Sequence, residues 1–272
     1  MSRLYTENLT VSYGGADIVK GLNVRIPDGK VTAIIGPNGC GKSTLLKAMA
    51  RILVAKAGAV YLDGKEIGKE STRKIARKLA ILPQTMTAPE GLTVGELVSY
   101  GRFPHQRGMG RMKADDVKSV EWALQVTGVS EFRNREVDAL SGGQRQRVWI
   151  AMALAQETEI ILLDEPTTYL DLCHQLEVLE LLRHLNRKEN RTVVMVIHDL
   201  NQAARFADYL VAMKDGTIVK EGTPEEVMTR EVLRNVFHID VEIGLDPRTR
   251  KPVCLTYDLL QTPFASREEA LA

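Results

Sequence analysis

The stretch Gly36-Pro37-Asn38-Gly39-Cys40-Gly41-Lys42-Ser43-Thr44 decides the fold of this 272-residue chain. It fits the pattern G-x-x-x-x-G-K-[ST], in which glycines let the backbone close around phosphate and present its N–H groups. The apolar run Lys30 to Ile35 precedes it, and residues 43–53 have the spacing of a helix that starts at the loop. This order of strand, loop and helix predicts a nucleotide site. We expect Lys42 to contact the β- and γ-phosphates and the Ser43 hydroxyl to bind Mg²⁺.

Cys40 stands inside this loop, next to the predicted helix N-terminus. The positive end of a helix dipole lowers the pKa of a nearby thiol, so we expect Cys40 to react with alkylating agents and Mg-ATP to shield it. The alternative is a purely structural cysteine at a position that needs a small residue.

Two carboxylates follow a second apolar run, in Ile160-Ile161-Leu162-Leu163-Asp164-Glu165. An acid at the end of a buried strand holds the Mg²⁺ shell in P-loop enzymes, which suits Asp164. Glu165 points elsewhere and is predicted to orient and deprotonate the attacking water. A strand that runs into a solvated acidic turn is the alternative, and Lys42 and Ser43 weigh against it.

A second phosphate-binding helix start is predicted at Leu140-Ser141-Gly142-Gly143-Gln144. Ser141 is a good N-cap, and the two glycines after it expose backbone N–H groups to an anion. A merely capped helix is the alternative. Many P-loop ATPases would fit the motifs described so far, and this pentapeptide narrows the set of P-loop ATPases to which the chain can belong.

The rest of the chain predicts an α/β fold with an inserted helical part. Short strands separated by turns fill residues 3–35, and residues 93–155 are mainly helical, with Val117, Val120 and Leu124 on one face. A helix with Leu172, Leu176, Leu179, Leu182 and Leu185 separates the apolar runs 160–163 and 192–197, which predicts a βαβ unit. Asp215-Gly216 predicts a hairpin, and we expect the polar tail from about residue 262 to be mobile.

Composition excludes several classes of protein. A net charge of +1 provides no field for attracting nucleic acid, so no nucleic-acid partner is expected. The three cysteines are far apart and form no Cys-x-x-Cys pair, which argues against disulfides and zinc and favours a reducing compartment. No window approaches the roughly 18 to 20 apolar residues of a membrane-spanning helix.

On these motifs and their order, the sequence resembles the ABC ATPase family from the first strand to about Val241. The resemblance implies a P-loop NTPase (RecA-like) core with an N-terminal antiparallel β layer and an inserted helical signature subdomain. It divides the chain into an ABC ATPase domain, 1–241, with the helical subdomain at about 93–155, and a C-terminal extension, 242–272.

The resemblance also assigns residues that the motifs alone do not. Tyr13 looks like the aromatic that stacks on adenine, Gln84 like the Q-loop glutamine near Mg²⁺ and the reacting phosphate, Asp171 like the D-loop acid, and His198 like the switch histidine. Taken alone, Tyr13 reads as an edge-strand aromatic and His198 as a strand-end cap. In the family, residues 140–144 of one protomer close over ATP held by the other protomer's loop. The resemblance therefore implies a homodimer that binds ATP and Mg²⁺. Tyr169 departs from the family pattern, because it occupies a D-loop position that commonly has a small residue, and this departure concerns the dimer contact and not the reaction.

Two classes of function remain, an importer subunit and a soluble ABC protein of translation or DNA repair. A single cassette without a long coiled coil favours transport, and a separate subunit favours a bacterial importer. The expected partners are permease subunits and, indirectly, an extracytoplasmic substrate-binding protein. The expected location is peripheral, on the cytoplasmic side of the cell membrane.

The cargo is indicated by the segment 91–105, which closes with Gly101-Arg102-Phe103-Pro104-His105. It looks like the ferric-siderophore, haem and cobalamin importer group, and an iron chelate is our expectation. Import of zinc or manganese, or of cobalamin, is the alternative. Physically, this segment starts the helical subdomain and is suited to form a socket for a membrane partner, while a plain helix start with a proline turn is the other interpretation.

Overall fold

The strand that enters the Gly-rich loop lies inside a six-stranded sheet in the computed structural model, which describes residues 2–106, 112–168 and 170–260. The strand order is β10-β9-β3-β8-β7-β6, in which β10 is antiparallel to β9 and the other pairs are parallel. The bounds are β3 Val31–Ile35, β6 Leu79–Leu82, β7 Ile160–Asp164, β8 Thr192–Val196, β9 Tyr209–Lys214 and β10 Thr217–Gly222.

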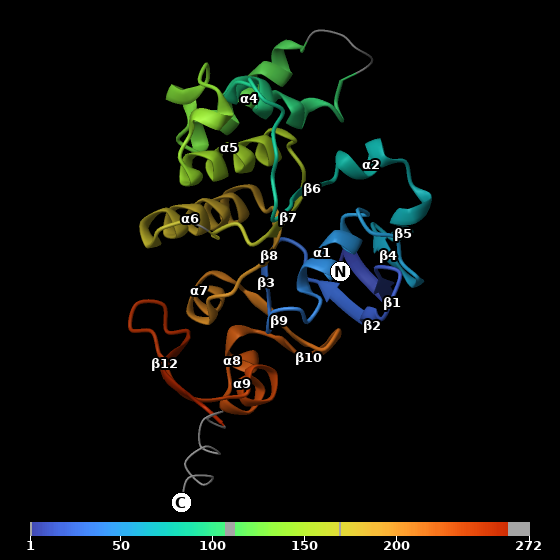
Figure 1. Ribbon diagram of the computed structural model, residues 1–272, viewed down its shortest axis with the longest axis vertical. Coiled ribbons are helices and arrows are strands. Elements are labelled where there is room, and N and C mark those ends of the chain that lie inside the picture. The colour runs from blue at the N-terminus through green and yellow to red at the C-terminus, as the bar shows by residue number, and fades with distance from the viewer. Residues whose placement is uncertain (1, 107–111, 169, 261–272) are drawn as a thin grey trace, which may run out of the picture.

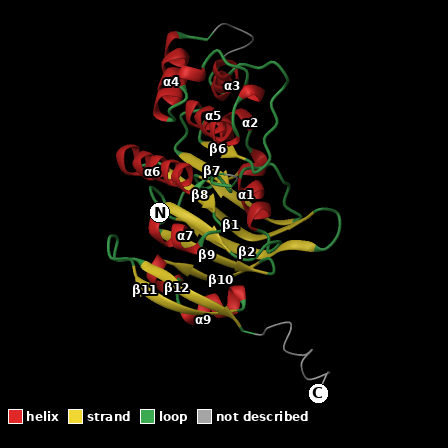
Figure 2. Cartoon of the chain, turned by 60° about the vertical axis from the view of Figure 1, so that its left-hand side comes forward, coloured by secondary structure: helices red, strands yellow, loops and turns green. Residues whose placement is uncertain are grey.

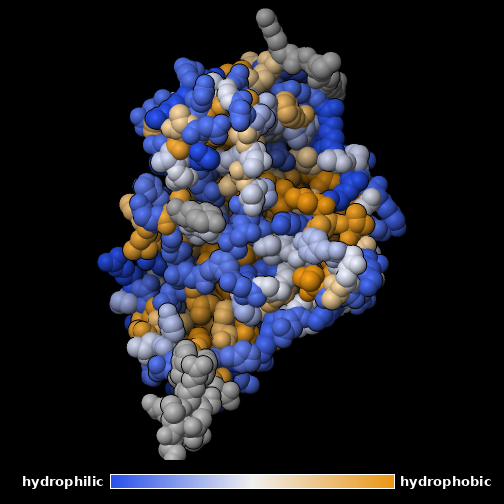
Figure 3. All heavy atoms as spheres, viewed as in Figure 1, coloured by the Kyte–Doolittle hydropathy of each residue, from blue (hydrophilic) through white to orange (hydrophobic). Residues whose placement is uncertain are grey.

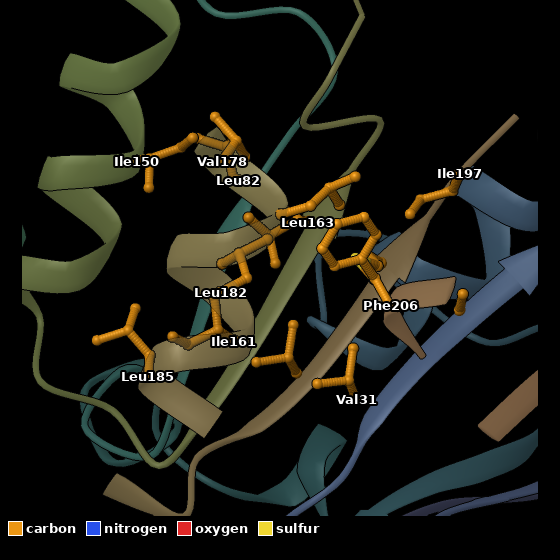
Figure 4. Close-up of a cluster of buried hydrophobic side chains, with 14 of the residues drawn as sticks. Val31, Leu82, Ile150, Ile161, Leu163, Val178, Leu182, Leu185, Ile197 and Phe206 are labelled. Carbon is orange, nitrogen blue, oxygen red and sulfur yellow. The ribbon is translucent and has the colours of Figure 1, made fainter. Parts of the chain in front are cut away.

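Both faces of this sheet are covered, which explains the continuous apolar runs in its strands. Every residue of β3, β7 and β8 is buried, as expected for parallel strands with layers on both sides. In β7, Ile161 and Leu163 join a core with the long helices, whereas Ile160 and Leu162 join a second core on the opposite face. Figure 4 shows part of the first core, where Leu182 and Phe206 lie against the sheet.

The second core lies between the sheet, helix α1 and an N-terminal β layer, as the family resemblance implied (Figures 1 and 2). The layer is a four-stranded antiparallel sheet with the order β2-β1-β4-β5. Helix α1 ends at Met49, earlier than predicted, and Arg51 just beyond it has a left-handed φ of 61°. The bounds are β1 Leu4–Ser12, β2 Asp17–Ile26, α1 Lys42–Met49, β4 Ala57–Leu62 and β5 Lys65–Glu66.

The helical subdomain is inserted between β6 and β7 and stands at one end of the molecule (Figure 1). Its helices are α3 Val94–Ser99, α4 Ala114–Val126 and α5 Gly142–Ala155, and the short α2 Thr72–Ala76 lies before β6. Val120 and Leu124, which were predicted to share one face of α4 with Val117, are buried. Val117 itself is 38% exposed, so it lies at the edge of the buried face. In the described ranges, no helix combines the length and the apolar character needed to cross a membrane.

The predicted βαβ unit is confirmed as β7, α6 (Leu172–Glu189) and β8. Leu179, Leu182 and Leu185 are buried on one face of α6. Leu172, the first residue of this helix, is 67% exposed.

The C-terminal part of the chain contains two hairpins, of which only the first was predicted from the sequence. The hairpin at Asp215-Gly216 joins β9 to β10, with positive φ at both residues. Beyond it, β11 and β12 form a second antiparallel hairpin that was not predicted, and β11 crosses the boundary that we expected after residue 241. The bounds are α7 Leu200–Phe206, α8 Pro224–Val227, α9 Arg230–Phe237, β11 Ile239–Leu245 and β12 Pro252–Leu259. The tail expected to be mobile, residues 262–272, lies outside the described residues.

Candidate nucleotide site

The loop between β3 and α1 has the backbone shape that its glycines make possible. Gly36 has a φ of 153°, and a Cβ there would clash with the Met213 carbonyl oxygen and approach the Cys40 sulfur. Gly41 is the N-cap of α1 with a φ of 102° and brings no capping side chain, so the first turn of α1 presents its N–H groups toward the loop. This backbone shape suits the predicted binding of phosphate by the loop.

Lys42 is held inside this loop by the loop itself. Its side chain is buried, and Nζ donates to the carbonyl oxygens of Gly36 at 2.8 Å and Pro37 at 2.9 Å. These two bonds keep the ammonium in the cavity beside the loop, where a phosphate would lie.

Ser43 and Asp164 meet at the base of the site, as the sequence predicted. The Ser43 hydroxyl donates to Oδ1 of Asp164 at 2.7 Å, and Oδ2 of this buried carboxylate has no hydrogen-bond partner among the described residues. Burial raises the pKa of Asp164, against the opposing effect of the Ser43 hydrogen bond. Hydroxyl and carboxylate oxygens are ligands that Mg²⁺ prefers, so this donor set fits that ion, which would also give Oδ2 a partner.

Glu165 lies at the centre of a polar cluster. Its Oε1 is 2.6 Å from Nε2 of His198, and its Oε2 accepts from the Thr168 hydroxyl at 3.0 Å. Burial alone would raise the pKa of Glu165, but hydrogen bonds from His198, Thr168 and Gln84 together lower it below its ordinary value. A carboxylate that stays ionised and is held by three neighbours can orient a water and accept its proton.

These residues line one open cavity of about 670 Å³. Its walls combine the loop with the ends of β7 and β8 and with the N-terminal layer, and they consist of Tyr13, Ile18, Asn38, Gly39, Gly41, Lys42, Ser43, Thr44, Gln84, Glu165, Thr168 and His198. Tyr13 stands at the rim, 60% exposed, with its hydroxyl 3.4 Å from Oγ1 of Thr44. An exposed aromatic ring beside a phosphate loop is suited to stack on a flat base.

Two residues that line the cavity, Ile18 and Thr168, were not predicted from the sequence, where neither was given a role. A hydroxyl three residues after a candidate base is the signal that could have revealed Thr168, since such a spacing in a turn brings the two side chains together.

The second helix start lies apart from this cavity. Ser141 caps α5 and forms a capping box with Gln144, in which each side chain pairs with the other residue's backbone N–H, and Gly142 is exposed. Residues 140–144 are not among those that line the cavity of their own chain. Asp171 caps α6 and lies 2.8 Å from Nδ1 of His174, also away from the cavity. Tyr169 lies outside the described residues.

Cys40 contradicts the prediction of a reactive thiol. Its side chain turns away from the cavity into the second core, and burial raises its pKa more than the Lys42 charge lowers it. Cys40 therefore contributes backbone, not side chain, to the loop.

Alkylation of the folded protein with iodoacetamide should therefore modify Cys173 about tenfold or more faster than Cys40 and Cys254, because Cys173 is exposed and the other two are buried. Peptide mass spectrometry measures the three rates, and the urea-unfolded chain serves as the control in which all three react. Labelling of Cys40 as fast as that of Cys173 would contradict the burial described here.

The fold and this site define a P-loop nucleotide hydrolase. A family model for the ABC transporter family matches residues 19–168, and the chain belongs to that family as an ATP-binding, ATP-hydrolysing subunit. The iron(3+)-hydroxamate import ATP-binding protein of Bacillus subtilis is 63% identical to it over 96% of this chain and 97% of the relative. The achromobactin transport ATP-binding protein of Dickeya dadantii is 50% identical over 94% and 96%.

Solved structures agree on the fold. An inward-facing transporter described as of the metal-chelate type has a TM-score of 0.79 and 31% identity, over 94% of this chain and 98% of the other. A dimeric bacterial ABC transporter cassette has a TM-score of 0.73 and 32% identity, over 81% and 98%.

Proposed function

We propose that this ATPase powers the import of an iron(III) chelate through a separate permease. The observation that carries the proposal is the 63% identity, across 96% of this chain, to a protein named for iron(3+)-hydroxamate import. The ATPase itself does not touch the cargo, so its cargo follows from the permease with which it assembles and, through the permease, from an extracytoplasmic substrate-binding protein. We place the subunit on the cytoplasmic side of the cell membrane.

In the proposed reaction, the loop Gly36 to Thr44 binds the phosphates, and Lys42 moves from the loop carbonyls to the β- and γ-phosphates. Ser43, Asp164 and Gln84 would hold Mg²⁺, which offsets phosphate charge when bound. Glu165 orients the attacking water and takes its proton, and the 2.6 Å contact from His198 holds the Glu165 carboxylate in place.

The remaining site residues are proposed to act in a homodimer. Tyr13 stacks on the adenine at the rim of the cavity, and Ser141 to Gln144 of one protomer close on the ATP held by the other, with Asp171 at the contact between them. Two features support this assignment. The exposed capped N-terminus of α5 is suited to bind an anion but does not reach its own chain's cavity, and a similar cassette is a dimer.

The permease is proposed to bind where the helical subdomain meets the core. A cavity of about 680 Å³ lies beside α3, and the rings of Tyr100 and Phe103 stack there with centroids 4.8 Å apart. Ile52 and Val54, after α1, are 51% and 86% exposed, and Figure 3 shows hydrophobic surface in the area between α1 and α2. Exposed apolar residues on both sides of α2 suit an apolar segment of a partner.

The segment Gly101 to His105 anchors this region. Arg102 is buried and donates to Asp116 at 2.9 Å and to the Ala155 carbonyl oxygen at 2.7 Å, and His105 contacts the Gln156 carbonyl oxygen at 2.8 Å. The Pro104 carbonyl oxygen accepts from two arginines of the α2 region, Arg73 and Arg77. These contacts support a role for the segment in holding the docking region against both parts of the protein.

Deletion of the gene should impair growth on a ferric chelate or haem as sole iron source and leave zinc-limited growth normal. The wild-type gene should restore growth, whereas the Glu165→Gln gene should not, which ties the defect to ATP hydrolysis. A growth defect under zinc limitation with normal use of iron chelates would overturn the iron assignment and favour the zinc or manganese alternative.

A further inference from the structure

The helix that follows His198 is short and begins at a side-chain cap. Asp199 accepts from the backbone N–H of Gln202 at 2.8 Å and is the N-cap of α7, which ends at Phe206. His198 directly precedes this cap, so the placement of α7 sets the direction in which the His198 backbone leaves β8. A helix of seven residues does not hold its own geometry in water and depends on what packs against it.

The N-terminal end of α7 is tied to the C-terminal hairpin through Asn201. Its Oδ1 accepts from the Cys254 N–H at 2.8 Å, and its Nδ2 donates to the Cys254 carbonyl oxygen at 3.1 Å. The side-chain amide thus pairs with β12 through both groups of one residue, which fixes the plane of the amide. Cys254 is buried in the same core as Ala203 and Ala204 of α7, so the contact is backed by packing.

The C-terminal end of α7 is tied to the same hairpin through Lys251. Its Nζ donates to the carbonyl oxygen of Arg205 at 3.2 Å and also to that of Ala207. A cation at this position satisfies carbonyls that a helix end leaves unpaired and complements the negative end of the dipole. Burial lowers the pKa of Lys251, an effect that the carboxylates of Asp208 and Glu225 oppose. The hairpin therefore contacts both ends of the helix.

We propose that Asn201 and Lys251 are positioning residues for ATP hydrolysis, through which the hairpin β11–β12 holds α7 and thereby keeps His198 against Glu165. The proposal rests on the role of His198 given under Proposed function. It assigns to the C-terminal part of the chain a task in catalysis, at residues that do not line the nucleotide cavity. ATP binding depends on the loop after β3 and is independent of this contact.

Replacing Asn201 by alanine removes both bonds to Cys254. We expect kcat to fall about tenfold while KM for ATP stays within about twofold, because the change displaces a residue of the reaction step and not of the binding loop. Lys251→Met should act in the same direction, and Lys251→Arg, which keeps a cationic donor, should retain most of the activity. The matched control is Asp240→Asn, which removes the exposed pair of the same hairpin with Arg230 at 3.0 Å and leaves α7 untouched, so its kcat should not change.

A double-mutant cycle with His198→Ala separates positioning from general destabilisation. Single-turnover hydrolysis with enzyme in excess measures the slow variants, and circular dichroism confirms that each is folded at the assay temperature. If Asn201 acts through His198, adding Asn201→Ala to His198→Ala should cost no further rate.

The outcomes distinguish a failure of the proposed role of His198 from a failure of the positioning role of Asn201 and Lys251. Normal hydrolysis by His198→Ala would remove the proposed role of His198 and the positioning proposal with it. A strong defect in His198→Ala together with normal kcat in Asn201→Ala, or with a loss that adds in full in the double variant, would overturn the positioning proposal alone.

Discussion

Glu165→Gln should bind ATP normally and lose turnover by roughly 10² to 10⁴, the range typical of a lost general base. The amide keeps the size of the carboxylate and can still accept a hydrogen bond from Thr168, but it cannot take the proton of the attacking water. Since the bound ATP is then not consumed, the variant should accumulate as an ATP-dependent dimer by mass action. A phosphate-release assay and size-exclusion chromatography with and without ATP measure the two quantities.

Glu131→Gln is the matched control for this change, because it makes the same substitution at an exposed position of the helical subdomain. It should hydrolyse ATP at the wild-type rate and elute as the wild type does. Near-normal hydrolysis by Glu165→Gln would remove Glu165 as the base. A Glu165→Gln protein that stayed monomeric in saturating ATP would count against the shared site instead.

Ser141→Arg should abolish hydrolysis and ATP-dependent dimerisation while ATP still binds to the isolated subunit. Ser141 is exposed at the start of α5 and outside the cavity of its own chain, so a large cation there leaves the loop that contains Lys42 intact. It removes the N-cap and fills the space in which a second protomer would close over the phosphates. Titration with a fluorescent ATP analogue measures binding, and chromatography in ATP measures the dimer.

Ser130→Arg carries the same substitution at another exposed serine and should be active. Lys42→Ala gives the opposite pattern to Ser141→Arg, because it should weaken nucleotide binding itself. The two-protomer site would have to be abandoned if Ser141→Arg hydrolysed ATP at the wild-type rate.

Most of the fold could be predicted because its strands are buried on both faces. Runs such as Ile160 to Leu163 leave few alternatives to a covered parallel strand, and the loop before α1 has a shape that depends on its glycines. The hairpin β11–β12 was not predicted, although β11 alternates apolar and polar residues from Ile239 to Leu245. In β12, the alternating apolar residues Leu255, Tyr257 and Leu259 are 60% to 66% exposed, so apolar character there does not indicate which face is buried.

The positions of site residues could be predicted where a motif fixes the backbone. The orientation of a side chain, which depends on its tertiary surroundings, was harder to predict. The shared Mg²⁺ role predicted for Ser43 and Asp164 requires them to lie close together, and Ser43 in the first turn of α1 is hydrogen-bonded to Asp164 at the end of β7. Cys40 could not be placed in this way. Proximity to a helix N-terminus predicted a low thiol pKa, but the side chain points into the core, where desolvation raises the pKa more than the Lys42 charge lowers it. The contacts of Asn201 and Lys251 join segments about fifty residues apart, and no local sequence pattern indicates such contacts.

The ammonium of Lys42 has two partners within its own loop, the Gly36 and Pro37 carbonyl oxygens. A phosphate that binds Lys42 would therefore replace these carbonyl oxygens as hydrogen-bond acceptors. The contribution of Lys42 to the binding free energy would be the difference between its interactions with the phosphate oxygens and with the carbonyl oxygens. An anionic phosphate oxygen competes well against a neutral carbonyl, whereas a ligand that offers no charge at that distance does not. If Lys42 binds phosphate as proposed, the loop should bind nucleosides weakly and favour nucleotides whose phosphate chain is long enough to reach Lys42, because its own carbonyl oxygens compete for the ammonium.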